Sequence, residues 1–254
     1  MSDLLMFDTD IARPTRASQS AVTDAPPNGP PRDNFEVRVP LPDKTLFYLT
    51  ATSPHTDTFE VHGPVRQFRT FRDKVEQIVA VSPAATKKLE DLEEDKPDVF
   101  IGGFRTFVVE LGNDDYTKLE VIREINPKVY EHLPAPVYLV TSHGPMIHDL
   151  GGTVQTLQSG RRLGYAATSH LVSSFTDFDV AKQHATQAMD IMLQKEINKG
   201  GGIGMIRTDV DDNKSPSMGN WMSVAMGGGK VWEVKVTVVK EVNKGKTNTF
   251  NTDI

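Results

Sequence analysis

The stretch FRTFVVELGNDDYTKLEVIREI, residues 104–125, decides the fold class of this chain. Two runs rich in β-branched, aromatic and other apolar residues, 104–111 and 116–125, flank the tetrapeptide Gly-Asn-Asp-Asp at 112–115. Gly, Asn and Asp tolerate the backbone conformations of a tight hairpin turn. The stretch therefore predicts two antiparallel strands joined by a short turn.

Further strands and helices are predicted on both sides of this hairpin. Alternating or short apolar runs bounded by turn residues predict strands, and apolar residues spaced three and four apart predict helices. The predicted strands are 35–41, 45–51, 58–61, 137–141, 203–208, 221–226 and 230–239, and the predicted helices are 71–79, 83–94 and 179–198. This order does not alternate as it does in a parallel sheet. We therefore expect an α+β fold with mostly antiparallel sheet, one long helix and two short helices, and we find no internal sequence repeat.

The long helix is predicted to follow a cap at Thr176 or Asp177 and to end before the glycines at 200–202. Its apolar side is expected to pack on the sheet. That side consists of Val180, Ala181, Ala185, Ala188, Met192 and Leu193.

Residues 1–34 differ in composition from the rest of the chain. Five prolines stand among Ser, Thr, Asp and Ala, and proline prevents regular helix or sheet. We expect an extended N-terminal arm over 1–34 and a single α+β domain over 35–254. The arm's large apolar side chains are predicted to contact a neighbouring subunit, and they are Leu4, Leu5, Phe7 and Ile11.

The composition of the 254 residues excludes several classes of protein. The chain has no cysteine, which rules out disulfides and thiolate metal sites. Its net charge of −6 disfavours a nucleic-acid partner, and no apolar run is long enough to span a membrane. The acidic start lacks the basic residues of a secretory signal. We expect a cytoplasmic protein with no membrane partner, metal or cofactor.

The last predicted strand contains one candidate catalytic pattern. Asp209, followed after about twenty residues by Glu233-Val234-Lys235, resembles the core of the PD-(D/E)xK nucleases. The resemblance implies that the two carboxylates bind Mg²⁺ and that the lysine assists the attacking water. In the alternative interpretation, Trp232 lies on the buried face of the strand, and Glu233 and Lys235 lie on its solvent face.

Other segments resemble parts of the small ADP-ribosyltransferases. TLFYLTATS (45–53) or VYLVTSHG (137–144) resembles the opening strand, which turns a hydroxyl or a histidine toward NAD. SSFTDFDVAKQHA (173–185) resembles the helix after a middle strand, and KVWEVKV (230–236) resembles the strand with the terminal glutamate. The resemblance implies a transferase that uses NAD.

The sequence favours a non-enzymatic assembly subunit, such as a shell, tail or decoration component of a virion-like particle. This expectation rests on the arm, the β-rich body and the glycine loops. The expected partners are other copies of the chain or other assembly subunits. The metal-dependent nuclease and the ADP-ribosyltransferase-like enzyme are the alternatives.

Overall fold

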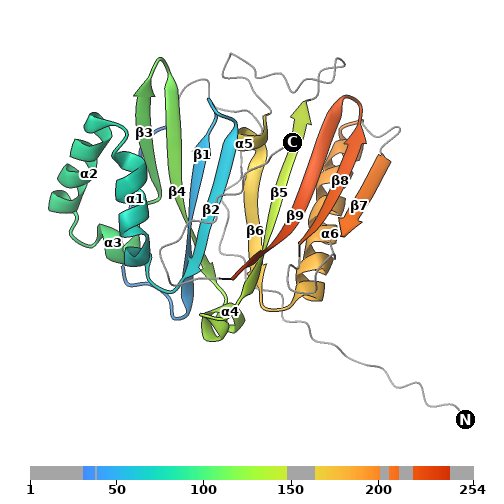
Figure 1. Ribbon diagram of the computed structural model, residues 1–254, viewed down its shortest axis with the longest axis horizontal. Helices are drawn as coiled ribbons and strands as arrows, with labels where there is room; N and C mark the ends of the chain where they lie inside the picture. The colour runs from blue at the N-terminus through green and yellow to red at the C-terminus, as the bar shows by residue number, and fades with distance from the viewer. Residues whose placement is uncertain (1–30, 38, 148–163, 201–205, 212–219, 241–254) are drawn as a thin grey trace, which may run out of the picture.

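The computed structural model describes residues 31–37, 39–147, 164–200, 206–211 and 220–240. Two antiparallel sheets stand side by side, with the helices α1 (Arg72–Val79) and α2 (Pro83–Asp95) beside the first sheet, α6 (Phe178–Asn198) beside the second, and α5 (Tyr165–Thr168) between the two (Figure 1). The fold is therefore α+β, as the sequence predicts.

The first sheet, sheet A, has the strand order β2-β1-β4-β3. Its strands are β1 (Thr45–Ser53), β2 (Thr58–Val65), β3 (Thr106–Gly112) and β4 (Asp115–Ile125). The predicted hairpin over 104–125 is confirmed, because β3 pairs with β4 through a turn at Asn113 and Asp114. Both turn residues have positive φ, 54° and 64°, which is the conformation of the favoured two-residue hairpin turn.

The second sheet, sheet B, has the strand order β6-β5-β9-β8-β7. Its strands are β5 (Val137–Ile147), β6 (Ser169–Phe175), β7 (Ile206–Asp211), β8 (Trp221–Gly227) and β9 (Lys230–Val239). Both sheets follow one plan: a pair of strands, a helical segment, and a return in which the last strand pairs with the first. The chain thus repeats a topology although we find no sequence repeat.

Each sheet also contains a His-Gly-Pro sequence at which the strand register shifts. Gly63 in β2 and Gly144 in β5 have φ of 109° and 118°. A Cβ atom at either glycine would lie 2.7 Å from a carbonyl oxygen of the neighbouring strand, that of Phe47 or Val231. Positive φ and this close approach require glycine at both positions.

The long helix α6 (Phe178–Asn198) packs on the outer face of sheet B. It is capped as predicted, since the Asp177 carboxylate accepts a hydrogen bond from the amide of Val180 at 2.9 Å. The other helices are η1 (Phe68–Phe71), α1 (Arg72–Val79), α2 (Pro83–Asp95), α3 (Val99–Gly102), α4 (Pro127–His132) and α5 (Tyr165–Thr168). In the part of the chain that the structure describes, none of these helices is long and apolar enough to cross a membrane.

Two apolar cores hold these layers together. The larger core includes residues of sheet A, of α1 and α2, and also Val137, Leu139 and Val239 from sheet B. The smaller core lies between sheet B and α6, around Trp232 and Met189. Because the larger core takes residues from both sheets, apolar burial holds the sheets against each other.

Two details of the sequence prediction are wrong. The described residues of 35–41 do not form a strand: a bridge joins the preceding residue, Asn34, to Thr106, and Pro40 and Pro42 lack the amide hydrogen that a strand ladder needs. Val180 is not on the packed side of α6, because its side chain is 42% exposed, whereas Met189, which the prediction omitted, is fully buried.

Met189→Ala is expected to lower the free energy of unfolding by about 2–5 kcal/mol, because it leaves a cavity between α6 and sheet B. Ile191 lies two residues further along the same helix and is 58% exposed. Ile191→Ala is therefore the matched control and should change stability by no more than about 0.5 kcal/mol. Urea denaturation of both variants measures the difference, and equal losses would contradict the placement of α6.

Candidate functional site

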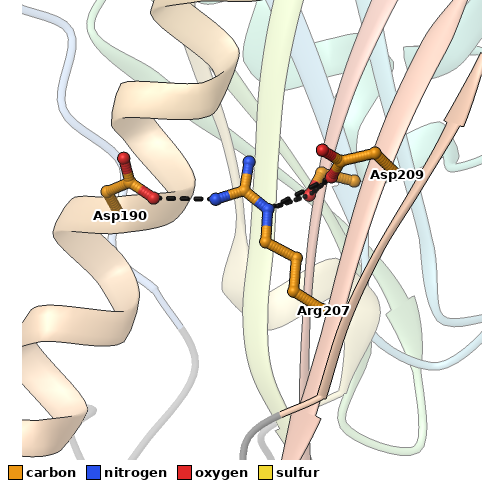
Figure 2. A network of polar contacts seen from close by, with 4 residues as sticks. Asp190, Arg207 and Asp209 are labelled. Carbon is orange, nitrogen blue, oxygen red and sulfur yellow. Dashed lines mark hydrogen bonds and ion pairs between the residues drawn. The ribbon is translucent and has the colours of Figure 1, made fainter.

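Asp209, one of the three residues of the nuclease pattern, belongs to a polar network between sheet B and α6 (Figure 2). Its Oδ1 accepts hydrogen bonds from Ser223 Oγ at 2.6 Å and from Arg207 Nε at 3.1 Å. Arg207 Nη1 also donates to Asp190 of α6 at 2.8 Å. The network ties the helix to β7 and β8, which is a structural role.

Glu233 and Lys235, the other two residues of that pattern, point to the opposite face of sheet B. Asp209 is the register partner of Ser223, and Ser223 is the partner of Val234. Because successive side chains of a strand alternate between faces, the neighbours of Val234 lie away from Asp209. The structure does not bring the three residues together, and nothing in the described residues favours a nuclease.

The face that carries Glu233 and Lys235 is turned toward sheet A rather than toward open solvent. Trp232 is buried against α6, as the alternative interpretation predicted. Glu233 and Lys235, however, expose only 16% and 24% of their side chains. The apolar arm residues Leu4, Leu5, Phe7 and Ile11 lie outside the described residues.

His143 of β5 is at the centre of a polar cluster on this face. It is 1% exposed and is the register partner of Glu233. Its Nδ1 lies 2.6 Å from Ser169 Oγ, and its Nε2 lies 3.0 Å from Thr141 Oγ1 and 3.2 Å from Tyr165 Oη. The Tyr165 ring stacks on the imidazole with centroids 4.2 Å apart. We name the following residues the His143 cluster: Thr141, His143, Tyr165, Ser169, Glu233 and Lys235.

The hydrogen bonds show which nitrogen of the His143 imidazole carries the proton. Ser169 Oγ donates its one proton to the carbonyl oxygen of Tyr165 at 2.5 Å, so it accepts from His143 Nδ1–H. Burial, and then the positive charge of Lys235, lower the pKa of His143 to about 3, so the ring is neutral. The lone pair of the neutral ring is therefore on Nε2, facing Tyr165 and Thr141.

Tyr165 links His143 to the charged pair on β9. Burial raises the pKa of Tyr165 above its ordinary value, and the carboxylates of Glu233 and Asp57 raise it further. The protonated phenol can donate to His143 Nε2 while it accepts from Lys235 Nζ, which lies 3.5 Å from Oη. These contacts fix the Tyr165 ring over the imidazole.

Glu233 has hydrogen-bonding capacity left. Lys235 Nζ lies 2.7 Å from Glu233 Oε1, the distance of an ion pair. Among the described residues, however, no donor makes a well-directed hydrogen bond to this buried oxygen. In the described part of the chain, Glu233 Oε1 is therefore a buried acceptor whose only close partner is the ammonium group of Lys235.

The sequence analysis named Glu233 and Lys235, and it pointed to a hydroxyl or a histidine of VYLVTSHG, which contains Thr141 and His143. It missed Tyr165 and Ser169. Tyr165 and Ser169 lie in α5 and β6, neither of which was predicted. The sequence SHLVSSF, residues 169–175, does not alternate between polar and apolar residues, so no clear signal for β6 was available.

The His143 cluster does not have the composition of a metal site. Within the described ranges, no three His, Asp or Glu side chains are placed to hold a metal ion. No protein family, no curated protein and no solved structure matches this chain. Its function must therefore be inferred from its own residues.

The depressed pKa of His143 predicts loss of stability in acid. An unfolded histidine takes up a proton below pH of about 6.5, whereas the folded ring stays neutral until about pH 3. Between these values, this group lowers the free energy of unfolding by up to about 1.4 kcal/mol per pH unit as the pH falls.

Urea denaturation of the parent and of His143→Gln across this pH range measures how much His143 contributes to the pH dependence of the unfolding free energy. The variant should show a shallower dependence of unfolding free energy on pH. His132→Gln, at an exposed histidine, should keep the slope of the parent. Parallel slopes for the parent and His143→Gln would contradict the prediction.

Proposed function

We propose that this chain is an enzyme of the ADP-ribosyltransferase type, which cleaves the nicotinamide–ribose bond of NAD and transfers the ADP-ribose group to an acceptor. One observation carries the proposal: His143 of β5 and Glu233 of β9 are register partners on neighbouring strands, and the ring of Tyr165 stacks on the imidazole of His143. The two strands come from distant parts of the sequence. Their pairing places the carboxylate of Glu233 beside the imidazole that Tyr165 covers.

The placement of the segments that resemble the family supports this proposal. The opening strand corresponds to β5, which carries His143, rather than to β1. SSFTDFDVAKQHA spans the end of β6 and the start of α6, as a middle strand followed by a helix requires. The strand with the terminal glutamate, β9, lies directly beside β5.

The chemistry of the transfer requires a carboxylate of this kind. When the glycosidic bond breaks, nicotinamide leaves with the bonding electron pair, and positive charge develops on the ribose ring. The carboxylate of Glu233 stabilises this charge or accepts a hydrogen bond from a ribose hydroxyl. The acceptor then attacks the anomeric carbon and loses a proton.

The side chains of the His143 cluster differ in their access to a substrate. Glu233 is the catalytic carboxylate, and the half-buried Tyr165 offers an aromatic surface for the flat nicotinamide ring. His143 is 1% exposed beneath Tyr165. Its part is to hold the tyrosine in place, instead of touching NAD itself.

Glu233→Gln is expected to lower the rate of nicotinamide release from NAD by roughly 10²-fold, because the charge that stabilises the transition state is lost. Asp209→Asn is the matched control and should keep the parent rate, since Asp209 lies on the other face of sheet B. Chromatographic measurement of nicotinamide, with basic and acidic protein acceptors present, gives the rates.

A parent protein that releases no nicotinamide with any acceptor would contradict the proposal. The same two variants also test the nuclease alternative in a Mg²⁺-dependent DNA and RNA cleavage assay. Cleavage by the parent that is lost in both variants would favour the nuclease.

A second candidate function is that of a non-enzymatic assembly subunit whose arm contacts a neighbour. The anchoring of Asp33 and Asn34 on β3 favours it. Asn34 exchanges backbone hydrogen bonds of 2.9 Å with Thr106, and the Asp33 carboxylate accepts from the amide of Val108 at 2.7 Å and from Lys88 Nζ at 2.9 Å. An arm that starts from this point on a sheet edge would have a defined origin and a reach of up to about 100 Å.

Deleting residues 1–30, which keeps the anchor at Asp33 and Asn34, is expected to leave the far-UV spectrum and the melting temperature unchanged. Self-association should weaken, because the apolar contacts of the arm are lost. Light scattering after size-exclusion chromatography measures the mass across a range of concentrations.

The matched control keeps the length of the arm and replaces its apolar anchors, Leu4, Leu5, Phe7 and Ile11, with serine. It should behave as the deletion does. A full chain that is monomeric at every concentration would contradict the assembly function.

A further inference from the structure

The turn between β1 and β2 reaches from sheet A to the helix that carries Tyr165. Asp57 Oδ1 accepts a hydrogen bond from the amide of Ala166, at 2.9 Å, although the two residues are more than a hundred positions apart. The same oxygen would lie 2.7 Å from a Cβ atom at Gly164. The carboxylate therefore sits against the start of α5, immediately before and after Tyr165.

The turn that presents Asp57 is itself well fixed. Asp57 has a φ of 53°, a left-handed conformation that aspartate tolerates better than most residues. His55 Nδ1 lies 3.1 Å from the carbonyl oxygen of Tyr116 on β4, and the hydroxyls of Ser53 and Thr117 lie 2.8 Å apart. The start of β4 in sheet A thus holds the turn.

The helix α5 in turn holds the imidazole of His143. The Thr168 hydroxyl accepts a hydrogen bond from the amide of Gly144, at 3.1 Å. Ser169, directly after the helix, bridges the Tyr165 carbonyl and His143 Nδ1. A displacement of α5 would therefore move both Tyr165, which stacks on the imidazole of His143, and Ser169, which contacts its Nδ1.

We propose that Asp57 is a positioning residue for the His143 cluster: its carboxylate holds α5 so that Tyr165 covers His143, and it makes the site in sheet B depend on sheet A. The part of this proposal that concerns catalysis rests on the proposed NAD-cleaving function. The part that concerns the cover over His143 does not.

Asp57→Leu removes the acceptor while keeping the branched shape of the side chain, and it should uncover His143. Asp57→Gly, which adopts the positive φ of this position without strain, should do the same. The probe is diethyl pyrocarbonate, which modifies accessible neutral imidazoles, and peptide mass mapping reports the rate at His143 alone. We expect a rise of roughly tenfold, since a lost hydrogen bond of ordinary strength shifts an opening equilibrium by that factor. Asp57→Asn keeps an oxygen acceptor and should restore protection.

A second variant tests the same contact from the other side. Gly164→Ala places a Cβ atom against Asp57 Oδ1 and should also uncover His143. The double variant Asp57→Ala, Gly164→Ala removes the crowding but also the hydrogen bond, so it should stay as reactive as Asp57→Leu. Far-UV spectra and melting curves identify any variant that fails to fold, and Gly164→Ala then decides the test.

Nicotinamide release provides the separate readout for catalysis. In Asp57→Leu the KM for NAD should rise about tenfold with a smaller change in kcat, because Tyr165 is misplaced and Glu233 is intact, and Asp57→Asn should recover the parent KM. Unchanged reactivity of His143 in folded Asp57→Leu and Gly164→Ala overturns the positioning role. Raised reactivity in a protein without NAD cleavage supports the positioning role and refutes the proposed function alone.

Discussion

One buried hydroxyl group fixes the position in which the apolar core packs the two sheets together. Tyr48 of β1 is 0% exposed, and its Oη lies 2.5 Å from both Glu124 Oε2 of β4 and Ser174 Oγ of β6. Burial, and then the charge of Glu124, raise the pKa of Tyr48, so the phenol keeps its proton and donates it to the carboxylate. A buried hydroxyl without partners costs about 1–3 kcal/mol, so the sheets are held where these three groups meet. Glu124 also accepts from Ser173 of β6, which adds a second contact between the sheets.

The elements that the sequence predicted well are those whose signals are local. The turn at Asn113 and Asp114, the cap at Asp177 and the alternation around Trp232 each specify their own stretch of backbone, and the structure has the predicted hairpin, helix and strand there. Residues 35–41 show the limit of such signals. They alternate as a strand does, but a strand needs a partner, and alternation does not report whether one is present.

The candidate site was predictable only in part, for the same reason. The resemblance of VYLVTSHG and KVWEVKV to two strands of one family pointed to His143 and Glu233, which the fold pairs in register. It did not reveal that Tyr165 covers the imidazole, because that contact depends on α5, a helix of four residues. The nuclease pattern failed for a geometric reason: spacing along the chain does not specify which face of a sheet a residue occupies, and Asp209 and Glu233 occupy opposite faces.

Because β9 lies in the middle of sheet B, the order of synthesis limits the order in which the strands of this protein can pair. Sheet A is complete once the chain has been made as far as Ile125, so its strands can pair while the rest is still in synthesis. Strand β5 emerges soon afterwards but must wait about a hundred residues for its partner β9, and pairings so distant in sequence form slowly. Until then, β5 has no strand on the side where β9 pairs in the finished sheet. Glu233 thus joins the cluster last, against a sheet A that is already folded and that supplies the turn bearing Asp57.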